Sequence, residues 1–374
     1  MSNPARYTIE SETFTLTNPT KNGSTFAGWT GTGLSGATMT VEIAQGSTGA
    51  RTYTATWTGG GSTPDFTIPT FSEKHSVILE GEIGLKFYVY LPVTEGIDYT
   101  NSYMEFDISG DKSNELKYYK ADNNRNIDGN MYHYFTCYMS SVQMADKITA
   151  TFHYGDNLSV SQEYSVKEYL DNILEGNFST EAKDLMTAIQ DYGHFAQQML
   201  SKANGWTIGK EFAEMPASFN DASYNASEIQ EARDGVKDYA IVRNTGDSGI
   251  EKVEFSLLFD SKTTINVYLT VKSTYAGTVS ATFNGTEAQK LSDGRYFVQI
   301  RNIPAHELAT MYEINVTAGS SFTVKVAALS YVDTMINKTD ATIGGVDLQT
   351  MKNAVTAFYR YYAKAIAYQN SLTQ

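Results

Sequence analysis

A switch from strand-like to helix-like periodicity occurs twice along this chain, and it constrains the fold more than any other feature. Between residues 66 and 164, apolar and polar residues alternate in short runs typical of β-strands. From Val166 onward the apolar positions recur at helical spacing. The same order returns between residues 253 and 370. This repetition predicts two copies of one unit, each a set of strands followed by a helical hairpin.

The two copies align in several places. The alignment matches Tyr88 with Tyr268, Asp128-Gly129 with Asp293-Gly294, Tyr169 with Tyr331, and Tyr192 with Phe358. Because Asp-Gly suits a hairpin turn with positive φ, both Asp-Gly pairs are predicted to be β-hairpin turns.

The long helix of each hairpin carries an apolar stripe that needs a partner. We expect each stripe to pack on the strands of its own unit, because sequential elements usually lie together. The stripe residues are Leu185, Met186, Ile189, Tyr192 and Met199 in the first copy, and Met351, Val355, Phe358, Tyr362 and Ile366 in the second.

These patterns predict a β-rich α+β chain in four parts. Residues 1–62 form a small N-terminal β module, and residues 66–203 form a β-sandwich-like strand set plus a helical hairpin. Residues 204–235 connect this copy to the second, at residues 236–374. The connector has room for one short polar helix near its end.

The N-terminal part resembles the Listeria–Bacteroides repeat, also called the internalin-type B-repeat. The matching segments are Phe14-Thr15-Leu16-Thr17-Asn18-Pro19-Thr20, Thr25-Phe26-Ala27-Gly28-Trp29, Gly46-Ser47-Thr48-Gly49 and Tyr53-Thr54-Ala55-Thr56-Trp57. The resemblance implies a β-grasp-like fold. The family usually opens with a strand that ends in an Asn-Gly-Gly turn. That strand is missing here, so we expect the chain to begin inside a repeat and to be a fragment of a longer protein.

Such repeats occur in secreted surface proteins of Gram-positive bacteria. The duplicated unit also resembles a module found in tandem in secreted proteins of gut clostridia, and that resemblance carries no known activity. Together the resemblances imply an extracellular protein, at the cell surface or secreted. Its signal peptide and anchor would lie outside this chain.

Composition restricts the partners. With 28 basic and 42 acidic side chains, the chain has a net charge of −14 and should repel nucleic acid and anionic membranes. No apolar run approaches the roughly 18 residues of a membrane-spanning helix, so no membrane insertion is expected. A single cysteine, Cys137, excludes a disulfide framework.

Catalytic motifs are missing from the sequence. It has neither a Gly-x-Ser-x-Gly nucleophile elbow nor a phosphate-binding P-loop. His306-Glu307 begins a zinc-protease pattern, but Thr310 stands where the second zinc-binding histidine belongs. We therefore predict a protein that is not an enzyme and uses no cofactor.

Calcium is the best metal candidate. Oxygen donors alternate as in a calcium-binding loop, at Asp122, Asn124, Asn126 and Asp128. However, Ile127 occupies the position that needs glycine, and His133 replaces the closing glutamate. A hairpin turn at Asp128-Gly129 is the alternative that we favour.

Aromatic side chains are the candidate binding residues. Trp206 lies outside any periodic stripe, just after the first helical hairpin, while Tyr359, Tyr361 and Tyr362 lie partly off the apolar side of the last helix. Such an aromatic helix end either packs on a neighbouring domain, which we favour, or presents a protein-binding face.

The function that we predict is a non-enzymatic extracellular module, a spacer with an adhesive or binding role towards a host protein or a glycan. One alternative is a host-protein-binding domain of the immunoglobulin-binding, superantigen type. A second alternative is a carbohydrate-binding module of a larger glycan-degrading protein.

Overall fold

The computed structural model describes residues 3–4, 6–19, 25–58, 67–93, 98–108, 111–118, 124–155, 157–220, 223–258 and 262–373. The chain forms two compact units. One consists of residues 1–69 and 92–94, and the other of residues 70–91 and 95–374.

The described residues of the N-terminal unit include two pairs of antiparallel strands. Strand β1 (Phe14–Thr15) pairs with β3 (Glu42–Ile43), and β2 (Thr25–Gly31) pairs with β4 (Tyr53–Thr58). Its small core centres on Trp29, whose indole Nε1 donates a hydrogen bond to Asn18 Oδ1 at 2.9 Å. Burial of the ring with its polar edge paired is the usual arrangement for a core tryptophan.

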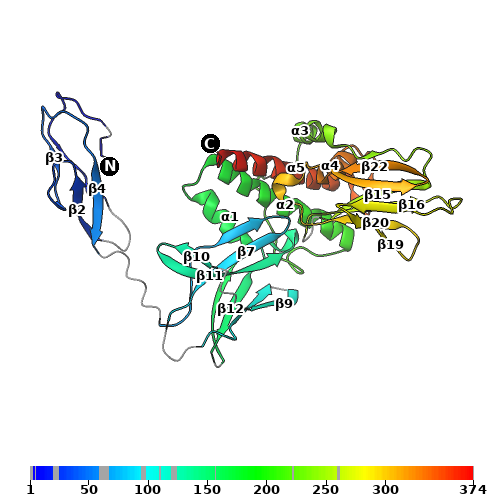
Figure 1. Ribbon diagram of the computed structural model, residues 1–374, viewed down its shortest axis with the longest axis horizontal. Coiled ribbons are helices and arrows are strands. Elements are labelled where there is room, and N and C mark those ends of the chain that lie inside the picture. The colour runs from blue at the N-terminus through cyan, green and yellow to red at the C-terminus, as the bar shows by residue number, and fades with distance from the viewer. Residues whose placement is uncertain are drawn as a thin grey trace. The chain divides into compact units, whose positions relative to one another are not determined.

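The larger unit begins with a set of strands that folds into two antiparallel sheets (Figure 1). Its strands are β5 (Thr70–Phe71), β6 (Ser76–Leu79), β7 (Ile83–Tyr90), β8 (Tyr103–Ile108), β9 (Asp111–Tyr118), β10 (Asn124–Ile127), β11 (Asn130–Met139), β12 (Ile148–Tyr154) and β13 (Leu158–Tyr164). One sheet has the order β10-β11-β7-β5, with β6 also paired to β7, and the other has the order β13-β12-β8-β9. Helices α1 (Val166–Glu175) and α2 (Thr180–Asn204) follow.

Helix α3 (Ala226–Val236) precedes a second strand set in the same unit. The strands are β14 (Val242–Arg243), β15 (Ile250–Leu258), β16 (Thr264–Val271), β17 (Ser280–Phe283), β18 (Thr286–Glu287), β19 (Gln289–Lys290), β20 (Tyr296–Ile300), β21 (Tyr312–Ala318) and β22 (Ser320–Val326). They form sheets of order β15-β16-β20-β19 and β14-β22-β21-β17-β18. Helix α4 (Ala328–Ile336), the short pair β23 (Thr342–Ile343) and β24 (Val346–Asp347), and helix α5 (Leu348–Ser371) complete the chain.

In each set the two sheets pack face to face. In the first set, Phe87 of β7 contacts Phe106 of β8 with ring centroids 5.7 Å apart, and Phe135 contacts Phe152 at the same distance. The inward residues alternate along the strands, as a sandwich core requires. The broad prediction of a β-rich α+β fold is therefore confirmed.

The two strand sets also share one pattern of pairing. The pairs β7–β11, β10–β11, β8–β9, β8–β12 and β12–β13 recur in the same order as β16–β20, β19–β20, β17–β18, β17–β21 and β21–β22. Tyr88 faces Tyr134 across its strand pair, and the aligned Tyr268 faces Phe297 across the equivalent pair.

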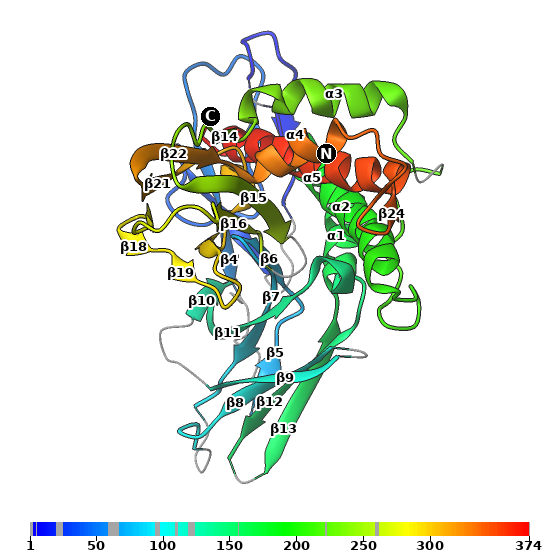
Figure 2. The ribbon, with the colours of Figure 1, turned by 90° about the vertical axis from the view of Figure 1, so that its right-hand side faces the viewer.

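The long helices do not use the partner that their apolar stripes were expected to find. Helix α2 packs lengthwise on α5 of the other copy, and the two lie side by side in both views (Figures 1 and 2). Tyr192 of α2 contacts Phe358 of α5 with ring centroids 5.6 Å apart. This corrects the expectation that each stripe packs on its own strands. The inner faces of the strands are already covered by the facing sheet, so the helices bury their stripes against one another.

The predicted connector is also part of this packing. Met215 is fully buried, and its backbone N–H donates to Gln197 of α2 at 2.8 Å. Helix α3 packs on α4 and α5. One continuous hydrophobic cluster includes residues of both copies and of the connector. The predicted boundaries at 203 and 236 therefore lie within one compact unit.

Candidate functional site

Trp206 lies at the surface, immediately after α2. The helix ends at Gly205, which has a φ of 73°, a left-handed conformation that glycine adopts easily. The Trp206 side chain is 36% exposed and meets the buried Phe212 edge to face, with ring centroids 6.0 Å apart. One side of the indole is therefore anchored, and the other is accessible.

The three tyrosines of α5 that are candidate binding residues differ in their exposure. Tyr361 is only 6% exposed and stacks on Tyr192, so it has no surface to offer a partner. This corrects its assignment as a binding residue, because Tyr361 packs on the helix that follows the first strand set. The reason is helical phase, because Tyr361 follows Phe358 by three residues on the side that faces α2.

Tyr359 and Tyr362 are half-buried, with ring centroids 6.4 Å apart. Tyr359 packs so closely on α3 that a Cβ at Gly235 would lie 2.0 Å from its hydroxyl oxygen. Burial and then the neighbouring Tyr239 raise the pKa of Tyr362 to about 12. These side chains fill the contact between α5 and the segment that includes α3, so they do not form one exposed face with Trp206.

The calcium candidates lie on a hairpin. Asp122 lies outside the described residues, while Asn124 and Asn126 belong to β10. Asp128 and Gly129 form the turn, with φ values of 52° and 91°. Asn126 Oδ1 accepts a hydrogen bond from the Gly129 N–H at 3.1 Å, and Asp128 pairs with Lys74 at 2.6 Å. The hairpin interpretation is confirmed here.

The aligned Asp293-Gly294 occupies the equivalent hairpin between β19 and β20. The Gly294 N–H donates to the Leu291 carbonyl at 3.0 Å, and Gly294 has a φ of 87°. Among the residues that the structure describes, no three His, Cys, Asp or Glu side chains lie close enough together to hold a metal ion.

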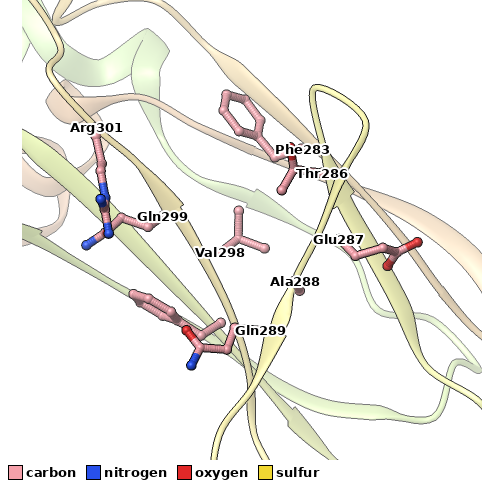
Figure 3. A pocket seen from close by; sticks show the side chains of 9 residues that line it. Phe283, Thr286, Glu287, Ala288, Gln289, Val298, Gln299 and Arg301 are labelled. Carbon is pink, nitrogen blue, oxygen red and sulfur yellow. The ribbon is translucent and has the colours of Figure 1, made fainter.

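A small pocket that the sequence did not reveal opens on the second sandwich. It has a volume of about 210 Å³ and lies between β17–β18 and β19–β20 (Figure 3). Aromatic, amide and charged side chains surround it: Phe283, Thr286, Glu287, Ala288, Gln289, Phe297, Val298, Gln299 and Arg301. The buried Val298 forms part of the lining.

A chain of hydrogen bonds runs along one wall of this pocket. The side chain of Asn266 on β16 is buried, with the residue only 5% exposed, and its Oδ1 accepts from Gln299 Nε2 at 2.8 Å. Gln299 Oε1 in turn accepts from Arg301 Nε. The amide of Gln299 is therefore held at both ends, which restricts where the guanidinium of Arg301 can lie.

The opposite wall carries the second charged group. Both carboxylate oxygens of Glu287 accept from Ser280 Oγ, at 3.1 and 3.2 Å. The Glu287 side chain is directed away from Arg301 (Figure 3). Within the described part of the chain, Arg301 takes part in no ion pair. The pocket therefore contains a positioned cation that no carboxylate of the described residues neutralises.

The first sandwich lacks this wall. By strand register, Asn266, Gln299 and Arg301 correspond to Lys86, Thr136 and Tyr138. Lys86 instead lies over the ring of Tyr134, with its Nζ 4.4 Å from the ring centroid. The polar chain is therefore particular to the second copy.

The alternation Phe297, Gln299, Arg301 was visible in the sequence as one face of a strand. What the sequence could not show is that Asn266 would lie directly across from Gln299. That register follows from the pairing of β16 with β20.

A second cavity, of about 510 Å³, lies in the N-terminal unit. Arg6, Tyr7 and Arg51 belong to its lining. Arg51 Nε donates to the Tyr7 hydroxyl at 3.0 Å, and that hydroxyl donates to the Gly49 carbonyl. These bonds join Tyr7 to the segment before β4 and account for the position of its side chain.

Within the described residues, no helix combines the length and the apolar character needed to cross a membrane. Comparisons with models of known protein families, with curated proteins and with solved structures found no match for this chain.

Proposed function

We propose that this chain is a non-enzymatic extracellular module of a bacterial cell-surface protein, acting as a spacer with an adhesive role. The location rests on the resemblance of residues 14–57 to repeats of Gram-positive surface proteins. The shared strand pairing supports a duplication, a common way to lengthen such proteins.

The observation that carries the spacer role is the pairing of α2 with α5. Besides the apolar contact, charged groups join the two copies at both ends of the helix pair. Lys364 of α5 pairs with Asp184 of α2 at 2.6 Å, and Lys202 of α2 pairs with Asp347 beside α5. Because exposed ion pairs contribute little energy, their role here is to fix the register of a contact that burial stabilises. The sandwiches are thus held together as one unit.

The observation that favours an adhesive role is the pocket beside Arg301. A shallow site lined by rings, amides and a positioned guanidinium suits recognition of a polar ligand at a surface. This favours the glycan alternative over recognition of a host protein, for which exposed Trp206 is the candidate contact.

Two measurements test this function. Brief protease treatment of intact cells should release peptides of this chain, whereas their restriction to the cytosolic fraction would contradict an extracellular location. The purified chain should be retained on immobilised mucin more strongly than on albumin. Retention on serum immunoglobulin alone would favour the host-protein alternative, and retention on neither surface would remove the adhesive role.

A further inference from the structure

We infer that the pocket beside Arg301 binds a saccharide that carries a carboxylate, such as a sialic acid or a uronic acid. This deepens the proposed function, on which it rests, by assigning a ligand class to one site. The inference depends on three features of the pocket: its cation, its rings and its size.

The cation selects for a carboxylate. A guanidinium forms paired, charge-assisted hydrogen bonds with a carboxylate, and these are stronger than bonds between neutral groups. Arg301 is held at Nε by Gln299, which is itself anchored on buried Asn266. Fixing a binding group before the ligand arrives lowers the entropy lost on binding. An arginine that only keeps the surface soluble does not need a fixed side-chain position.

The net charge of −14 does not oppose this assignment. Screening limits the range of exposed charges to about 8 Å at physiological salt. Among the described residues that line the pocket, the other charged one is Glu287, and its carboxylate is bonded to Ser280 on the far side. A bound carboxylate would therefore be influenced mainly by Arg301.

The rings and amides suit a sugar. Phe283 and Phe297 offer apolar surface for the C–H face of a pyranose, and the amide of Gln289 offers a donor and an acceptor for hydroxyl groups. The volume of about 210 Å³ lies below the range of roughly 300–1,000 Å³ that is typical for drug-sized ligands. The pocket therefore accommodates one sugar residue, at the end of a chain or as a side branch.

The experiment is a titration with the full chain, in which binding is monitored by ligand-observed NMR. The probes are 3′-sialyllactose, digalacturonic acid and lactose, of which lactose lacks the carboxylate. We expect at least one acidic probe to bind about tenfold more tightly than lactose, the effect of one charge-assisted hydrogen bond. Which acidic probe binds distinguishes a sialic acid from a uronic acid. Equal binding of lactose, or no binding of either acidic probe, would overturn the inference.

Variants locate the site. Arg301→Gln should weaken binding of the acidic probe about ten- to a hundredfold. Arg301→Lys should weaken binding less, because lysine keeps the positive charge and loses only the paired N–H donors of the guanidinium. The matched control is Arg295→Gln, on the same sandwich, where the guanidinium pairs with Asp293 outside the pocket. Unchanged binding by Arg301→Gln, or an equal loss in Arg295→Gln, would place the sugar elsewhere.

The two proposals fail separately. If the chain is retained on mucin but neither acidic probe binds, the adhesive function stands and the ligand assignment is wrong. If an acidic probe binds in solution but cell-surface proteolysis releases no peptides of this chain, the ligand assignment stands and the proposed location is wrong.

Discussion

Tyr192 of α2 and Tyr361 of α5 stack with their rings almost parallel, at an interplanar angle of 4° and a centroid distance of 5.3 Å. Tyr192 lies on the helix after the first strand set and Tyr361 on the helix after the second, and both are buried. The offset between nearly parallel rings is a geometry that aromatic pairs favour. This contact lies within the helix pair that joins the two strand sets in one unit.

Replacing Tyr361 with alanine should therefore destabilise the whole large unit. Truncating a buried aromatic side chain costs about 3–5 kcal/mol of unfolding free energy. The measurement is chemical denaturation of the full chain. Tyr359→Ala is the control on the same helix, and because Tyr359 is half-buried its cost should be smaller. A loss for Tyr361→Ala no larger than for the control would contradict its place in the core.

Neither copy should be stable when it is expressed alone. A chain of residues 66–203 exposes the face of α2 that α5 covers, and a chain of residues 236–374 exposes the matching face of α5. Such exposed apolar surface favours association or partial unfolding. Calorimetry should show one cooperative transition for the large unit of the full chain and none at that temperature for either piece. Matching transitions in the pieces would show that the copies are independent domains.

Gly81 should be intolerant of any side chain. It lies in the turn between β6 and β7 with a φ of 83°, and a Cβ there would lie 2.4 Å from the carbonyl carbon of Asn302 in the other copy. Gly129 is the matched control, since its φ is 91° but no atom lies within 4 Å of the Cβ position. Gly129→Ala should cost only the strain of the left-handed conformation, about 1–2 kcal/mol.

Gly81→Ala should lower the melting temperature more than Gly129→Ala does. It adds a backbone clash to the same strain and disturbs the nearby ion pair between Lys262 and Glu82. Equal shifts in melting temperature would mean that the backbones at Gly81 and Asn302 can move apart without a loss of stability.

The pH dependence of stability should contain a contribution from Asp191. Burial in α2 raises the pKa of this carboxyl group, while hydrogen bonds from the Ser218 N–H and Oγ and the charges of Arg360 and His194 oppose the shift. Because the folded pKa lies above the unfolded one, the folded state binds more protons between the two values. Stability due to this group therefore falls as pH rises through that window.

Asp191→Asn removes this titration and keeps a carbonyl oxygen for the Ser218 N–H. The measurement is the unfolding free energy of both proteins between about pH 3.5 and about pH 7, the range in which carboxyl groups titrate. The unfolding free energy of the variant minus that of the wild type should increase as pH rises. A difference that does not change with pH would show that Asp191 has an ordinary pKa.

Local features of this fold could be predicted from the sequence. The alternation of the strands, the helical spacing after Val166 and the Asp-Gly turns all depend on neighbouring residues, and the structure contains each of them. The two-residue turn at Asp128-Gly129 is an example, because its conformation needs only residues that tolerate positive φ. Sequence alignment also placed Tyr88 and Tyr268 at positions that the strand pairing makes equivalent.

The partner of each apolar surface was decided by tertiary structure alone. A stripe such as Ile189 and Tyr192 shows that one face of a helix is buried, but it carries no information about which surface covers it. Helix α5 covers that face, and it draws Tyr361 into the core. The Arg301 pocket depends on tertiary structure for the same reason. Its wall requires Asn266 opposite Gln299, two residues 33 positions apart that only the pairing of β16 with β20 brings together.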